Sequence, residues 1–132
     1  MSSFKLTYAT MFDPPAELHE RFDEAIATLK QNLGKENGMF INGENVFAGE
    51  KFVDYSPINT DMKLAVMQKG DESHAQAAIM AARNASPAWA RTPWQERIKL
   101  VRRAANLIDE RIFALGAAMS LEVGKNRMEA LG

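Results

Sequence analysis

The sequence predicts an α/β fold that is mostly helical, with about four short strands and an incomplete carboxyl end. Short apolar runs separated by turn-forming residues lie between residues 39 and 68, as in short strands, and apolar residues recur every three or four residues on either side, as in helices. The last helical pattern is unfinished at Gly132. We expect three parts: an N-terminal extension with one amphipathic helix (1–38), short strands (39–68) and a truncated helical layer (69–132).

The composition is that of one soluble globular domain. Of the 132 residues, 46% are hydrophobic and 25% are charged, and the net charge of −1 gives no general attraction to nucleic acid or to an anionic membrane. The first residues lack a signal-peptide pattern and no stretch is long and apolar enough to span a bilayer, which favours a cytoplasmic protein without a membrane partner. The absence of cysteine excludes a disulfide, a thiolate metal site and a cysteine nucleophile from these residues.

The first helix is expected to run from Pro14 to about Leu33. Asp13 can cap it, because a carboxylate accepts hydrogen bonds from the free amides, and proline suits the first helical position. Gly34 can end the helix in a left-handed conformation. Apolar residues at spacings of four and three share one face of this helix: Leu18, Phe22, Ile26, Leu29 and Leu33.

The next region predicts strands. Asn42-Gly43 tolerates positive φ, which favours a tight hairpin at 42–43 between the apolar runs Met39-Phe40-Ile41 and Val46-Phe47. Two more strands are expected over residues 51–55 and 62–67, with a turn at Pro57 between them. Four short strands cannot cover both faces of a sheet, so we expect them to pack on other elements.

Two long helices are expected after Gly70. Asp71 can cap the first, which breaks at Arg91 and should lie tightly against a layer, because its apolar stripe is mostly alanine. Thr92 is expected to cap the second in a capping box with Gln95. The stripe comprises Ala75, Ala78, Ala82, Ala85 and Trp89. The second helix carries a continuous apolar seam, which we expect to be packed on two sides: Trp94, Ile98, Val101, Ala105, Ile108, Ile112 and Leu115.

The carboxyl end predicts two further helical pieces. One covers residues 115–123 and ends at Gly124, and residues 126–131 begin another. Gly124-Lys125 lacks the upstream glycine of a phosphate-binding loop, so we interpret it as a helix stop. His19 and His74 stand apart from other ligand-type residues, and we assign neither a metal-binding nor a catalytic role.

A basic group on the second long helix leaves two other functions open. Acidic residues interleave with these basic residues, so an ion-paired, solvated face is favoured over a nucleic-acid interface, and salt-sensitive binding would distinguish them. A stand-alone helical module that docks a partner protein through its exposed seam is the main alternative function. The basic residues are Arg97, Lys99, Arg102, Arg103 and Arg111.

Six motifs in the second part of the chain are informative through their order and spacing. They are Ile41-Asn42-Gly43-Glu44, Ser56-Pro57, Pro87-Ala88-Trp89-Ala90, Thr92-Pro93-Trp94-Gln95-Glu96-Arg97, Arg102-Arg103-Ala104-Ala105-Asn106-Leu107-Ile108 and Leu121-Glu122-Val123-Gly124-Lys125. Together they resemble the amino-terminal part of the aldehyde dehydrogenase superfamily. The segment from Phe4 to Phe12, with the helix that follows it, further resembles the members that oxidise L-glutamate γ-semialdehyde, the 1-pyrroline-5-carboxylate dehydrogenases.

The resemblance implies NAD-dependent oxidation of this aldehyde to L-glutamate, at the end of proline breakdown. In the family, a cysteine thiolate attacks the aldehyde, hydride passes to the nicotinamide, a glutamate activates water and an asparagine with a backbone amide stabilises the oxyanion. In the family these positions and the glycine-rich dinucleotide turn all lie beyond the point that matches Gly132. The resemblance therefore assigns no catalytic, cofactor-binding or metal-binding residue here, and it implies that this segment alone is inactive and binds no NAD.

One candidate residue for the substrate region remains. Glu122 and Glu129 could face the active-site region of a complete enzyme, and Glu129 is the better candidate, although a surface or intrahelical role explains both. The resemblance implies that residues 69–132 cover the cofactor-binding domain. The expected partners are the remainder of the enzyme chain or other copies in a homo-oligomer. Alone, the segment should expose apolar surface and associate.

Overall fold

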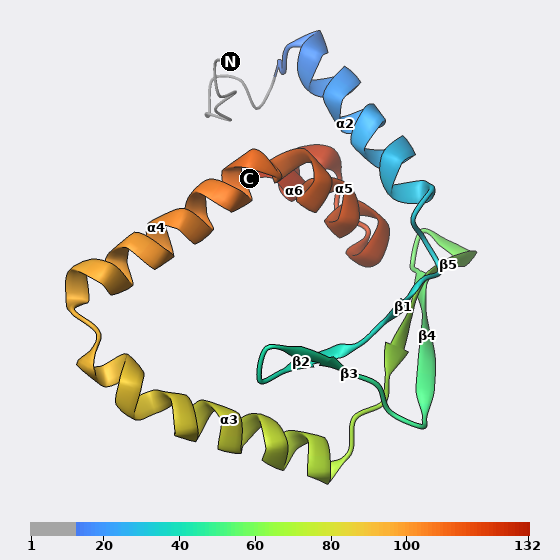
Figure 1. The fold of residues 1–132 in the computed structure, drawn as a ribbon. Coiled ribbons are helices and arrows are strands. Elements are labelled where there is room, and N and C mark those ends of the chain that lie inside the picture. The colour runs from blue at the N-terminus through green and yellow to red at the C-terminus, as the bar shows by residue number, and fades with distance from the viewer. Residues whose placement is uncertain (1–12) are drawn as a thin grey trace. The chain divides into compact units, whose positions relative to one another are not determined.

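The computed structural model describes residues 13–132. Over these residues the chain runs through one helix, five short strands and four further helices (Figure 1). Helix content with a few strands confirms the predicted α/β class, and the segment from Phe4 to Phe12 lies outside the described residues. In chain order the elements are α2 (Ala16–Lys30), β1 (Glu36–Asn37), β2 (Met39–Ile41), β3 (Glu44–Val46), β4 (Lys51–Ser56), β5 (Asn59–Gln68), α3 (Glu72–Arg91), α4 (Trp94–Glu110), α5 (Ile112–Val123) and α6 (Arg127–Leu131).

The contacts divide the chain into two units. One unit holds α2, residues 55–63 and residues 108–132, and the other holds residues 34–54 and 64–107. The three-part division predicted from the sequence stays a prediction.

The first unit has a small apolar core that α2 shares with α5 and α6. Leu18 and Phe22 of α2 are buried with Phe113 of α5 and Leu131 of α6. Gly116 makes this close packing possible, because a Cβ built there would lie 2.9 Å from Leu131 Cδ2. The predicted apolar face of α2 is therefore the face that packs.

The ends of α2 differ from the sequence-based expectation. Pro15, not Asp13, precedes the first helical residue, and no side chain caps the helix. The helix ends at Lys30 rather than near Leu33, because residues 31–34 form turns. Gly34 does have the expected positive φ, at 75°, but its amide donates to Leu64 O at 2.8 Å, so it begins the pairing with β5.

The carboxyl end of the first unit is held by a turn. Gly124 ends α5 with φ of 73°, as predicted, and its backbone lies against Pro57 and Ile58. The buried Ser56 hydroxyl donates to Leu121 O in the last turn of α5. These contacts fix where α5 stops.

The second unit contains a three-stranded sheet in the order β1–β5–β4. The sequence analysis missed β1, which is two residues long and pairs in parallel with β5, Glu36 opposite Val66. Gln68 joins β5 to β1 and to the loop at Ala48. Its Oε1 accepts from Ala48 N at 2.9 Å, and its Nε2 donates to Asn37 O at 2.9 Å and to Glu36 Oε1 at 3.0 Å. The hydrogen bonds from Lys51 and Gln68 hold the pKa of Glu36 below its usual value.

The predicted hairpin is present. β2 and β3 pair antiparallel, with Met39 opposite Val46 and Ile41 opposite Glu44. Asn42 and Gly43 form the turn with φ of 53° and 86°, respectively. The positive φ of both residues explains why Asn-Gly is favoured in this two-residue turn.

The two long helices meet at a corner whose local structure corrects one prediction. Thr92 Oγ1 donates backwards to Ala88 O at 3.1 Å, so it serves the end of α3 rather than capping α4. Pro93 O accepts the first helical bonds of α4, from Glu96 N at 3.0 Å and from Arg97 N at 3.2 Å. The expected capping box of Thr92 with Gln95 is therefore wrong. Pro87 lies inside α3 without ending it.

Neither α3 nor α4 buries a residue within the described chain. The alanine stripe and the part of the apolar seam on α4 are both exposed, which agrees with the expectation that this segment alone exposes apolar surface. Their packing against a further layer stays a prediction. The exposed large side chains on the two helices are Ile79, Met80, Trp89, Trp94, Ile98, Leu100, Val101 and Ile108. These helices present apolar surface that residues 13–132 do not cover.

Candidate functional site

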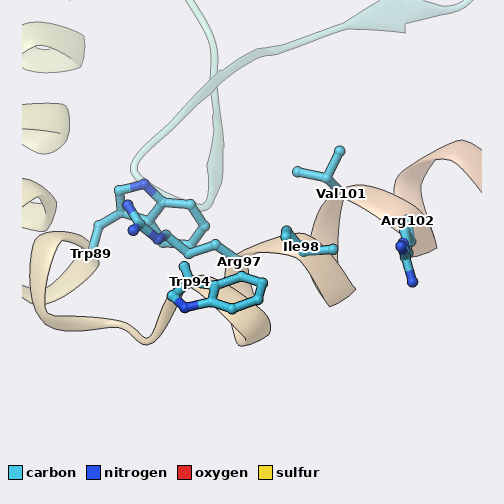
Figure 2. Close-up of a pocket in the computed structure, with 6 residues that line it drawn as sticks. All are labelled: Trp89, Trp94, Arg97, Ile98, Val101 and Arg102. Atoms are coloured by element: carbon cyan, nitrogen blue, oxygen red, sulfur yellow. The ribbon is translucent and has the colours of Figure 1, made fainter.

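A hollow lies at the corner between α3 and α4, and we call it the corner groove (Figure 2). Trp89 stands at the end of α3 and Trp94 opens α4, so the short turn brings the two indoles to one place. The Arg97 guanidinium lies 6.0 Å from the Trp89 ring centroid, a cation–π distance. Six residues line the groove, whose volume is about 520 Å³: Trp89, Trp94, Arg97, Ile98, Val101 and Arg102.

The chemistry of this lining permits binding but not catalysis by these residues. No carboxylate, hydroxyl, thiol or imidazole lines the corner groove, so it has no nucleophile and no general base. Trp94 is 60% exposed and Val101 is 67% exposed. The groove is the end of an open apolar face on α4 and is suited to contact with other apolar side chains.

The junction between β5 and α3 is the place where a strand leads into a long helix, as in nucleotide-binding folds. Here Asp71 fills the helix N-terminus: its Oδ1 accepts from Ser73 N at 2.9 Å and from His74 N at 3.2 Å. These bonds, with those from the Ser73 hydroxyl and the His74 ring, hold the pKa of Asp71 well below its usual value. Asp71 is thus the cap that the sequence predicted, and His74 completes the capping box.

Glu129, the predicted substrate-region candidate, is exposed on α6. Its Oε2 accepts from Asn126 N at 3.4 Å, and Asn126 Oδ1 accepts from Glu129 N at 3.0 Å. The two residues form a reciprocal capping box at the start of this helix. The side chain therefore has an intrahelical contact here, and its place near a substrate stays a prediction.

The other residues considered from sequence do not converge on one site. His19 lies beside Arg127 and His74 beside Asp71, so each imidazole has its own partner. Lys99 pairs with Glu96 at 2.7 Å, which is the interleaved ion pairing expected for the basic face. Among residues 13–132, no group of three or more His, Asp or Glu side chains is placed to hold a metal ion.

The comparison with family models gives a direct result. Residues 46–132 match the model described as the aldehyde dehydrogenase family. The chain belongs to the aldehyde dehydrogenase family. The matched range includes both long helices, and α2 and the β2 strand precede it.

Several relatives and solved structures that resemble this aldehyde dehydrogenase chain are named 1-pyrroline-5-carboxylate dehydrogenase. It is 34% identical over 111 residues to 1-pyrroline-5-carboxylate dehydrogenase 2 of Bacillus subtilis, covering 84% of this chain and 22% of that one. It is 40% identical over 94 residues to N-succinylglutamate 5-semialdehyde dehydrogenase of Serratia proteamaculans, covering 70% and 19%, respectively. A 1-pyrroline-5-carboxylate dehydrogenase from Thermus with bound NAD superposes with a TM-score of 0.87 at 27% identity, covering 99% of this chain and 26% of that one.

This chain corresponds to only a part of each relative. The chain spans about a fifth of the length of the curated relatives and matches their amino-terminal part.

The corner groove was not predicted from the sequence, although Trp89, Trp94 and Arg97 all belong to the motifs that resemble the family. The signal that could have found it is the close spacing of two tryptophans across a helix break. Over residues 13–132, no helix is long and apolar enough to cross a membrane.

Proposed function

We propose that this aldehyde dehydrogenase chain is the amino-terminal part of an enzyme that oxidises L-glutamate γ-semialdehyde to L-glutamate with NAD, in proline degradation. The observation that carries the proposal is the structural likeness to the NAD-bound Thermus enzyme over 99% of this chain. The relatives from Bacillus subtilis and Staphylococcus epidermidis bear the same enzyme name. The Serratia relative acts, by its name, on an N-succinyl derivative of the same semialdehyde, so a glutamate semialdehyde is common to these names.

The described residues do not fit NAD themselves. At the one junction where a strand leads into a long helix, the Asp71 carboxylate already accepts from the free amides Ser73 N and His74 N, and its charge would repel a pyrophosphate. Gly70 is used for packing, because a Cβ there would lie 2.9 Å from Met39 Sδ. NAD would therefore bind to parts of the enzyme outside these residues.

The same reasoning applies to the chemical step. The 132 residues contain no cysteine, so a thiolate nucleophile would also have to come from elsewhere in the enzyme. The part that this chain contributes is the apolar face of α4 with the corner groove, which would pack against the remainder of the enzyme. Burial of apolar side chains contributes about 25 cal/mol per Å² removed from water, so a face of this kind stabilises the assembled protein strongly.

The proposal is tested by joining this chain to the complementary part of a relative. The Bacillus subtilis relative is made without the amino-terminal part that matches this chain, and the two pieces are either fused or mixed. NADH formation is followed with L-glutamate γ-semialdehyde and, in parallel, with the N-succinyl compound. We expect NADH formation from the joined pieces with the first substrate, and none from either piece alone.

A matched pair of variants tests whether the face of α4 makes the join. Val101→Asp places a charge on the apolar seam, whereas Asn106→Asp places the same charge on another face of the same helix. We expect Val101→Asp to reduce the rate of NADH formation at least tenfold and Asn106→Asp to leave it within about twofold, since surface substitutions are usually small in effect. Equal effects of the two variants, or activity only with the N-succinyl compound, would contradict the proposal.

A further inference from the structure

Arg127, the first residue of α6, contacts three residues of α2. Its Nη2 donates to Asp23 Oδ1 at 3.0 Å, and its Nη1 lies 3.0 Å from His19 Nδ1. The guanidinium also lies 5.1 Å from the centroid of the Phe22 ring. Phe22 and Asp23 follow His19 by three and four residues, so both lie on the same side of α2 as His19. We call Arg127 and these three residues the Arg127 clamp.

The protonation state of His19 decides whether this contact can form. A guanidinium carries only donors and keeps its charge, so at 3.0 Å the Nδ1 of His19 must be an unprotonated acceptor. The proton of the neutral imidazole is then on Nε2. Once protonated, the ring donates from both nitrogens and places a second positive charge beside Arg127, so the hydrogen bond is lost.

Two neighbouring charged side chains, Arg21 and Glu129, have other partners than Arg127. Arg21 lies 3.9 Å from Glu17 and 4.2 Å from the centroid of the Phe113 ring, and Glu129 is engaged with Asn126. The Asp23 carboxylate attracts the guanidinium and would also attract a protonated imidazole, so it offsets part of the repulsion between Arg127 and protonated His19. The other carboxylates on α2 and α5 are Glu20, Glu24 and Glu122.

We propose that the Arg127 clamp is a pH-sensitive latch through which α2 holds α6 in place. With neutral His19 the latch is closed, and protonation of the imidazole weakens it. The five residues of α6 are too few to be helical on their own, so the helix depends on such contacts. α2 precedes the residues that match the family model, so the latch ties this preceding helix to the family region.

Amide hydrogen exchange on the whole chain tests the latch. The probes are the amides of Ala130 and Gly132, which bond to Asn126 O and Met128 O in α6, and the reference is the amide of Leu115 in α5. We expect the protection factors of the probes to fall about two- to fivefold when the pH is lowered from about 7.5 to about 5.5, while that of Leu115 stays constant.

Two variants assign the change to His19. His19→Gln keeps an acceptor but cannot titrate, so we expect its α6 protection to be the same at both pH values. His74→Gln removes the histidine at the start of α3, and we expect it to keep the pH dependence. A wild-type chain without pH dependence, or a His19→Gln chain that retains it, would overturn the latch.

The imidazole itself provides a second readout that folding alone would not move. Nitrogen chemical shifts distinguish the two neutral tautomers, and at neutral pH we expect His19 to carry its proton on Nε2. Arg127→Gln should allow both tautomers. A proton on Nδ1 in the wild-type chain would overturn the proposal. So would the absence of amide protection in both α5 and α6, because α6 would then not be held in place by α2. No substrate is needed, so the result does not depend on the proposed enzyme activity.

Discussion

At the residue scale, single polar and small side chains hold the strands and helices of each unit together. Gln68 is 7% exposed and makes three hydrogen bonds that join β5 to β1 and to the loop at Ala48. Gly116 is buried where α5 meets Leu131, and a methyl group there would require the Leu131 side chain to shift. Two predictions test these roles.

Replacing Gln68 with alanine should weaken the sheet of the second unit. The substitution leaves Ala48 N and Asn37 O without their partner, so we expect the free energy of local opening, measured by amide exchange at Val66, to fall by about 1–3 kcal/mol. The control is Gln76→Ala, because Gln76 is exposed and bonds only along its own helix, to Glu72. Unchanged exchange in Gln68→Ala would show that these bonds do not hold the sheet.

Replacing Gly116 with alanine should loosen the junction of α5 and α6. The new methyl group would lie 2.9 Å from Leu131 Cδ2 and 3.4 Å from Ala130 O, and relieving such overpacking costs about 1–3 kcal/mol. We expect exchange of the Gly132 amide to speed up accordingly. Gly49→Ala is the matched control, since a Cβ at Gly49 meets nothing within 4 Å. If both variants behave alike, close packing at Gly116 is not what holds α6.

At the scale of the elements, the start of α3 depends on one ionised carboxylate. Hydrogen bonds from Ser73 and from His74 hold the pKa of Asp71 well below its usual value in the folded chain. A group with a lowered folded pKa stabilises the fold above its unfolded pKa of about 3.9 and loses this contribution as the pH falls towards the folded value. The first turn of α3 should therefore open in acid.

The cap of α3 is tested by its pH dependence. The amide of Ala75 bonds to Asp71 O, and we expect its protection factor to decrease as the pH falls below about 4. Asn caps helices as well as Asp does but does not titrate, so Asp71→Asn should retain protection over the same range. The account of this cap fails if the variant and the wild-type chain lose protection together.

At the scale of the whole molecule, the exposed faces of α3 and α4 predict association of the isolated chain. Ile79, Trp94 and Val101 are each at least 60% exposed, which is unusual for so many large apolar side chains on one pair of helices. We expect concentration-dependent association in sedimentation experiments and thermal unfolding without one cooperative transition. Val101→Asp should reduce association more than Asn106→Asp does. A monomer with a sharp transition would contradict this prediction.

Local signals in the sequence were sufficient for most elements. The Asn42-Gly43 hairpin, the Asp71 cap and the left-handed Gly124 follow from residue types that favour one backbone conformation, so no distant contact was needed to predict them. β1 was missed because two residues carry no periodicity, and its pairing with Val66 is a long-range contact. The capping role of Thr92 was predicted wrongly because its hydroxyl could bond to either helix. In the structure it donates to Ala88 O of α3.

The candidate site was less predictable than the fold. The corner groove depends on the angle between α3 and α4, which no local pattern in the sequence fixes. The partner of His19 is Arg127, more than a hundred residues later, so its isolation in the sequence said nothing about its surroundings in space. The period of the apolar seam on α4 predicts that another surface covers it, but a period does not say which residues form that surface.

We propose above all that these residues are the amino-terminal part of a larger aldehyde dehydrogenase. The most direct test is to sequence the genomic DNA beyond the codon for Gly132 and to translate the same reading frame. We expect the frame to continue into a chain with a glycine-rich dinucleotide turn, a glutamate and a cysteine that can act as nucleophile. A stop codon directly after Gly132, confirmed in the transcript, would contradict the claim and would favour a stand-alone interaction module instead.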